Sequence, residues 1–176
     1  MSAMNEPSGG RKTSEGDDWS VDRFYHTVVN VTDLDRSIAF YQKLGFIVLH
    51  DRRNAVWPDF VATNFGMQRA KGRGALMVLA SDPEGPIIDL VEWTEPRFWP
   101  PTGPDRIPQI LAFRTRNVAR AYAALQARGV EFTNTLIGPD DALGLRGVCC
   151  CLDPDRNVVE LIEHAPGRRH SRTDDL

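Results

Sequence analysis

Residues 26–45 read HTVVNVTDLDRSIAFYQKLG, and residues 110–129 read ILAFRTRNVARAYAALQARG. Each stretch begins with alternating apolar residues, which are typical of a β-strand, and continues with apolar residues at helical spacing. A residue that caps helix N-termini, Asp33 or Asn117, separates the two patterns, and a glycine that can end a helix closes each stretch. The pattern therefore predicts the same strand–helix unit twice.

A second pair of matching stretches follows the first. Residues 82–90 read DPEGPIIDL and residues 153–161 read DPDRNVVEL, each a turn followed by an apolar strand with one carboxylate. The offset between matching stretches falls from 84 to 71 residues, so the first unit holds 13 extra residues within 51–71, where we expect a short helix over 58–66. We predict an α+β fold in which two βαβββ modules form a shared half-barrel cleft.

Composition sets the expected boundaries. We expect disordered tails at residues 1–20 and 166–176, where the chain is polar, and modules at residues 21–95 and 106–165. The linker at residues 96–105 is too rich in proline for regular structure.

Bulk composition excludes several classes of partner. The net charge of −3 provides no concentrated basic face, so we expect no nucleic-acid partner. No stretch reaches the roughly 20 apolar residues that span a bilayer, and the N-terminus has no apolar secretory segment. The three cysteines are consecutive, at 149–151, which suits neither a disulfide framework nor a cysteine metal site. We therefore expect a cytoplasmic protein with reduced thiols, and we assign the cysteines no role.

Two of these stretches carry a family resemblance. The His–apolar strand, Asp-Leu, Phe-Tyr helix and Leu-Gly-Phe of residues 26–46 resemble the opening of a module of the vicinal-oxygen-chelate superfamily. Residues 153–161 resemble its closing strand, and the resemblance extends over residues 24–164. The superfamily contains glyoxalases, bleomycin resistance proteins and dioxygenases, so the resemblance implies the fold more sharply than a reaction.

The resemblance also implies a metal site. The family takes one ligand from the first strand and one from the last strand of each module, and those positions hold His26, Asp89, Ile110 and Glu160. Ile110 cannot bind a metal. One imidazole and two carboxylates that converge on one point would suit a divalent cation such as Mn, Mg or Fe, and the residues do not distinguish these from Ni or Zn. Glu160 would also act as the catalytic proton shuttle.

Each of these side chains has a simpler interpretation. His26 could be a hydrogen-bonded, half-buried histidine. Asp89 could form an ion pair with Arg114 or Arg73, and Glu160 could pair with an arginine. Under these interpretations the protein binds no metal.

Three further residues are candidates for substrate binding. Arg114 shares a strand face with the ligand positions and could bind a carboxylate or phosphate through two hydrogen bonds, or it could reach solvent. Trp57 and Trp93 could line a pocket for a flat or apolar molecule, or they could belong to the core or to an interface.

Two functions follow from the resemblance. The first is a glyoxalase-like, metal-dependent lyase or isomerase that acts on a small molecule with neighbouring oxygens. The alternative is a metal-free protein of the same fold that binds and sequesters a small molecule, such as a drug or metabolite. In either case we expect a homodimer, because two small sheets leave edges and aromatic surface that pairing would cover.

Overall fold

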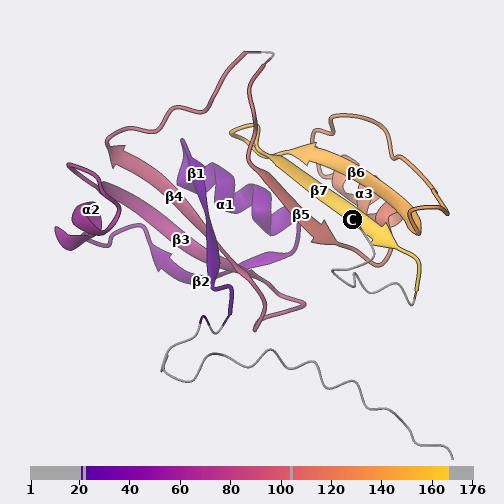
Figure 1. The fold of residues 1–176 in the computed structure, drawn as a ribbon, viewed down its shortest axis with the longest axis horizontal. Coiled ribbons are helices and arrows are strands. Elements are labelled where there is room, and N and C mark those ends of the chain that lie inside the picture. Colours follow the sequence, from indigo (N-terminus) through magenta and orange to yellow (C-terminus); the bar gives the residue numbers. More distant parts are fainter. Residues whose placement is uncertain (1–20, 22, 104, 167–176) are drawn as a thin grey trace, which may run out of the picture.

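The computed structural model describes residues 21, 23–103 and 105–166. The expected N-terminal tail and all but the first residue of the expected C-terminal tail lie outside the described residues. Figure 1 shows two β-sheets beside each other, the first in indigo to magenta and the second in salmon-pink, orange and yellow. Each sheet carries a ten-residue helix.

The first module has a four-stranded sheet in the order β1-β4-β3-β2, in which β1 and β4 are parallel and the other pairs antiparallel. A short helix, α2, lies between β2 and β3 and confirms the helix expected in the long loop. The elements are β1 (His26–Val31), α1 (Leu34–Lys43), β2 (Phe46–Arg52), α2 (Phe60–Asn64), β3 (Lys71–Leu79) and β4 (Ile87–Glu95).

The second module repeats this topology with one strand reduced. Its sheet has the order β5-β7-β6, in which β5 and β7 are parallel and β6 and β7 antiparallel. The counterpart of β2 is reduced to isolated bridges, among them Phe132 to Cys151 and Ile137 to Val148. Pro139 lacks the N–H that a regular ladder needs, and it lies in this segment. The elements are β5 (Ile110–Arg114), α3 (Val118–Ala127), β6 (Leu145–Leu152) and β7 (Val158–His164).

The helix boundaries are those that the sequence predicts. Asp33 accepts a hydrogen bond from the Arg36 backbone N–H at 3.0 Å, and Asn117 accepts one from Arg120 at 2.9 Å. Gly45 ends the first unit with a φ of +96° and Gly129 ends the second with +73°. Glycine adopts these left-handed values without the Cβ penalty of other residues. The α+β class with two βαβββ-like modules is confirmed.

One hydrophobic core extends through both modules. Alternate residues on each strand point into this core, so that the residues between them form an outer face on each sheet. No helix among the described residues could cross a membrane. Core residues from the two modules include Val29, Val31, Tyr41, Met77, Leu90, Leu111, Leu125, Cys149, Cys151 and Val159.

Hydrogen bonds join the modules at several points. Gln109, just before β5, donates its side-chain N–H to the Val28 carbonyl on β1 at 2.8 Å. The side chain of Lys43 donates to the Arg128 carbonyl at 3.0 Å, and Arg128 donates to the Lys43 carbonyl at 2.6 Å. The C-terminal ends of α1 and α3 therefore satisfy each other's free carbonyls. Asp155 accepts from the Thr32 backbone N–H at 3.1 Å.

Candidate functional site

A cavity of about 320 Å³ lies on the outer face of the first sheet, and we call it the first-module cavity. Its floor comes from β1 and β4, where Val29 and Leu90 point into the core and their neighbours point outward. Asp89, Val91 and Trp93, at alternate positions of β4, all line this face. The lining residues are His26, Val28, Arg52, Ala55, Val56, Trp57, Pro58, Val61, Phe65, Asp89, Val91 and Trp93, all from the first module.

The long loop of the first module builds the wall of this cavity. The rings of Trp57 and Trp93 meet edge to face, with centroids 5.2 Å apart, and Phe65 lies 6.4 Å from Trp93. The Trp93 indole N–H donates to the Asn30 side-chain oxygen at 2.7 Å, which fixes the ring. Both tryptophans thus line a cavity, which is one of the two interpretations of the sequence, and their part in ligand binding stays a prediction.

Two glycines on β3 make room for the cavity's side chains. A Cβ atom at Gly72 would lie 3.1 Å from the Trp57 ring, and a Cβ at Gly74 would lie 3.2 Å from an Arg52 guanidinium nitrogen. These contacts are closer than ordinary side-chain packing, so the Trp57 ring and the Arg52 guanidinium lie directly on the bare backbone. Alternating glycines inside a strand are the sequence signal for a close approach of this kind.

The polar end of the cavity is formed by His26, Arg52 and Asp89. The Arg52 guanidinium forms an ion pair with Asp89, a residue that is only 6% exposed. The Nδ1 atom of His26 and the Nε atom of Arg52 are buried and have no hydrogen-bond partner. Guanidinium N–H groups only donate, so the Arg52 Nε–H is a donor without an acceptor.

The partner of Asp89 differs from both expected arginines. Arg73 donates to Glu92 instead, at 2.9 Å, and this hydrogen bond to the Glu92 carboxylate raises the pKa of Arg73. Arg114 lies on the other sheet. Arg52 reaches Asp89 because a bulge between Val48 and His50 shifts the pairing register of β2. One extra residue reverses which side chains face outward, so simple alternation along β2 points Arg52 the wrong way.

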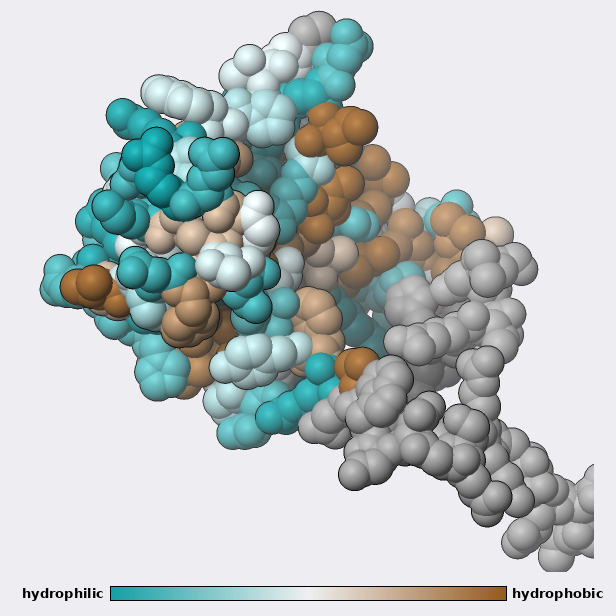
Figure 2. All heavy atoms as spheres, turned by 60° about the vertical axis from the view of Figure 1, so that its left-hand side comes forward, coloured by the Kyte–Doolittle hydropathy of each residue, from teal (hydrophilic) through white to brown (hydrophobic). Residues whose placement is uncertain are grey.

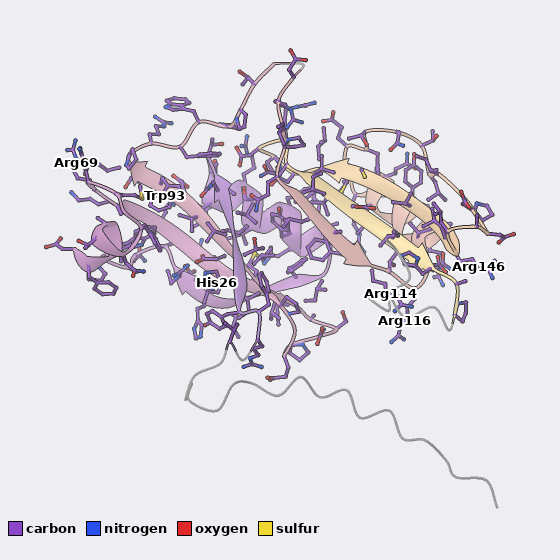
Figure 3. The ribbon with its side chains drawn as sticks, in the orientation of Figure 1. His26, Arg69, Trp93, Arg114, Arg116 and Arg146 are labelled. Carbon is purple, nitrogen blue, oxygen red and sulfur yellow. The ribbon has the colours of Figure 1, made fainter. Side chains whose placement is uncertain are left out.

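Glu160 and Arg114 lie on the outer face of the second sheet, away from the first-module cavity. Glu160 pairs in register with Ala112 and Cys150, and Ile110 at the start of β5 is 59% exposed. Figure 3 shows His26 and Trp93 in the first sheet and Arg114 at the far end of the second. The structure therefore brings His26 and Asp89 to one cavity and leaves Glu160 and Arg114 outside it.

The metal-site residues can be tested against this arrangement. Within the described part of the chain, no three His, Cys, Asp or Glu side chains are grouped so that they could hold a metal ion. A single chain therefore does not bring His26, Asp89 and Glu160 together, and their convergence between two paired chains stays a prediction. The physical reason is that the carboxylates lie on separate sheets, and Asp89 is already neutralised by Arg52. In a single chain these residues do not fit a metal ion.

The three cysteines are all free, as expected. Cys149 and Cys151 are buried in the core, and Cys150 lies on the outer face beside Glu160. Burial raises the pKa of the Cys149 thiol to about 11 and that of Cys151 to about 12. Burial, with Glu160 second, also raises the pKa of Cys150. Thiols with raised pKa values are poor nucleophiles at neutral pH.

Comparisons with known proteins agree with the geometry. Residues 23–161 match the model of the Glyoxalase/Bleomycin resistance protein/Dioxygenase superfamily. The chain is 27% identical over 162 residues to a lactoylglutathione lyase of Schizosaccharomyces pombe. The match covers 84% of this chain and 49% of the relative, so the chain spans about half the length of that curated protein.

Solved structures share the fold at low identity. A glyoxalase family protein from Bacillus cereus superposes with a TM-score of 0.68 at 14% identity, covering 84% of this chain and 97% of that one. An antibiotic-binding protein from Streptomyces superposes with a TM-score of 0.56 at 23% identity, covering 84% and 99%. At these identities the likeness shows the fold alone.

Proposed function

Because the chain belongs to the glyoxalase/bleomycin resistance/dioxygenase superfamily, we propose that it binds a small molecule, without a metal ion, in the first-module cavity. The observation that carries this proposal is the Arg52–Asp89 ion pair. It occupies the carboxylate that a metal ion would need, and it lies at the polar end of a cavity that already has an aromatic wall.

The form of the cavity supports ligand binding. Ligand sites are concave and mostly apolar, with a few polar groups that set orientation. The first-module cavity has this composition, with aliphatic and aromatic walls and a single polar end. The hydrogen bond from Trp93 to Asn30 holds one wall in place before any ligand arrives. A wall that is already ordered lowers the entropic cost of binding.

A glyoxalase-like, metal-dependent lyase or isomerase is the second candidate. The relative that favours it is the lactoylglutathione lyase, at 27% identity. His26 and Asp89 keep two of the family's ligand positions. We propose that in this case a homodimer would set the second sheet of one subunit over the first-module cavity of the other, which would add Glu160 to the site.

The two functions predict opposite responses to metal. Protein purified without added metal is titrated with Mn²⁺, Mg²⁺, Fe²⁺, Ni²⁺ and Zn²⁺ by calorimetry, beside the His26→Ala variant. The binding function predicts no saturable metal site and aromatic-ligand binding that a chelator leaves unchanged. The lyase function predicts a metal site and lactoylglutathione formation that are both lost in His26→Ala. That second result would overturn the metal-free proposal.

The dimer itself rests on exposed apolar surface. Ile110, Ile137 and Leu143 of the second module are 59%, 52% and 66% exposed. Hydrophobic residues also reach the surface in patches on the side shown in Figure 2. Contiguous exposed apolar surface favours association, and we propose a homodimer in solution.

A further inference from the structure

We infer that the Arg52 guanidinium serves as the fixed cation of the first-module cavity and binds the carboxylate of a planar aromatic acid. This inference rests on the proposed function and names the chemical class of its ligand. A guanidinium remains charged at every working pH and presents five N–H donors in a plane that matches a carboxylate.

Arg52 has the right place for this role. It leaves β2 on the outer face of the sheet because of the bulge before His50, and it contacts Asp89 at the end of the cavity where His26 also lies. Gly74 beneath it lets the guanidinium lie against the strand. A positive charge is therefore held beside the family's ligand positions by the chain itself.

Most of the donor capacity of Arg52 is unused. One terminal nitrogen donates to Asp89, and the Nε–H has no acceptor. About a third of the Arg52 side chain, 35%, is accessible, so a ligand can reach it. A buried donor without an acceptor is costly, so a small turn of the side chain that brings the Nε–H to a ligand oxygen recovers that cost. Nδ1 of His26 is a second unpartnered polar atom in the same cavity.

The walls select a flat, small molecule. Trp57 and Trp93 form a corner with an angle of 77° between their planes, so a third ring can stack on one and meet the edge of the other. The cavity volume of about 320 Å³ is at the low end for ligand sites, which suits one or two rings. An aromatic body with one acidic group matches both ends of the cavity.

Asp89 sets how strongly the acid binds. Among the described residues, Asp89 is the one side chain that accepts a hydrogen bond from Arg52, so a ligand carboxylate must compete with it for the same guanidinium. The substitution Asp89→Asn removes the negative charge and keeps a similar shape, so the positive charge of Arg52 is left without a negative partner. That variant should bind aromatic acids more tightly than the wild type, and it should bind neutral aromatics equally well.

The test uses 2-naphthoate and its neutral counterpart 2-naphthylmethanol, with a chelator present, followed by quenching of tryptophan fluorescence. We expect Arg52→Met to weaken naphthoate binding about tenfold or more and to change the alcohol by less than about twofold. Asp89→Asn should strengthen naphthoate binding about tenfold. Arg53→Met is the matched control, because Arg53 bonds Asp51 outside the cavity lining and should change neither.

The outcomes separate this inference from the proposed function. If Arg52→Met binds naphthoate like the wild type while the alcohol still binds, the carboxylate role of Arg52 is overturned and the binding function stands. If neither probe binds the wild type, both fail. If circular dichroism shows that these variants do not fold, the NMR ¹⁵N–¹H signal of the Arg52 Nε in the wild type decides instead. Its loss in Arg52→Lys assigns that signal. That signal must move when naphthoate saturates the protein, and an unmoved signal overturns the inference.

Discussion

The Tyr41 hydroxyl on α1 lies 3.2 Å from the Asp153 carboxylate, which belongs to the turn before β7 in the other module. Tyr41 is fully buried and Asp153 is 3% exposed. Asp153 also accepts from the backbone N–H groups of Asp155 at 2.9 Å and Asn157 at 2.7 Å. This one carboxylate therefore shapes its own turn and attaches that turn to the first module.

Removing these hydrogen bonds should weaken the whole fold. Tyr41→Phe deletes one bond and leaves the others in place, so we expect a loss of about 1 kcal/mol in the free energy of unfolding. Asp153→Ala leaves several buried donors without acceptors, and we expect a loss of about 3 kcal/mol. Urea unfolding followed by circular dichroism measures both. A single transition in each variant is expected, because the two modules share one core.

Asp153 should also make stability depend on pH. Burial raises the pKa of the Asp153 carboxyl, although hydrogen bonds from Asn157 oppose the shift. Its folded pKa is therefore above its unfolded value of about 3.9. Stability from the protonated form is present below that value and is lost as pH rises through the folded pKa. Asparagine at position 153 cannot ionise, so the free energy of unfolding of Asp153→Asn relative to the wild type should increase as pH rises through the folded pKa of Asp153. An unchanged difference between the two proteins at pH 4 and pH 7 would contradict the raised pKa.

The cysteines should react slowly with alkylating reagents. The raised pKa values of about 11 for Cys149 and about 12 for Cys151 leave little thiolate near neutral pH, and both side chains are buried. We expect iodoacetamide labelling of the native protein to be confined to Cys150 and to speed up with pH. Mass spectrometry of the labelled peptides measures this. Rapid labelling of all three sites under native conditions would show that β6 opens readily.

Freeing Asp89 should create a weak metal site. In Arg52→Met, the Asp89 carboxylate loses its cation and lies beside His26, which gives one oxygen and one nitrogen ligand on the same cavity end. We expect calorimetry to detect Ni²⁺ binding by this variant that the wild type lacks. The double variant Arg52→Met with His26→Ala is the control and should not bind Ni²⁺.

The chain should sediment as a homodimer at micromolar concentration. The expected mass is twice the 19.7 kDa of one chain. Replacing the exposed Ile110 on β5 with aspartate should shift the equilibrium toward the monomer, because a charge would be buried in an apolar contact. A wild-type protein that sediments as a monomer would argue against any site completed by a second subunit.

The features of the fold that depend on local sequence patterns could be predicted from the sequence. The strand–helix units, the Asp33 and Asn117 caps and the closing glycines depend on neighbours a few residues apart, and all could be predicted. The Arg52–Asp89 pair could not, because the bulge in β2 reverses the side-chain alternation and has no distinctive residue. The separation of Glu160 from His26 could not be predicted either, since it depends on how two whole sheets are placed.

The longer loop of the first module has a consequence for evolution. Residues 53–70 supply half of the cavity lining and little of the core, whereas the second module has no equivalent insertion and keeps its outer face open. After duplication, one copy could thus acquire a cavity wall while the other preserved the framework. Exchanging this loop for one of different length or composition should therefore reshape the cavity without refolding the scaffold.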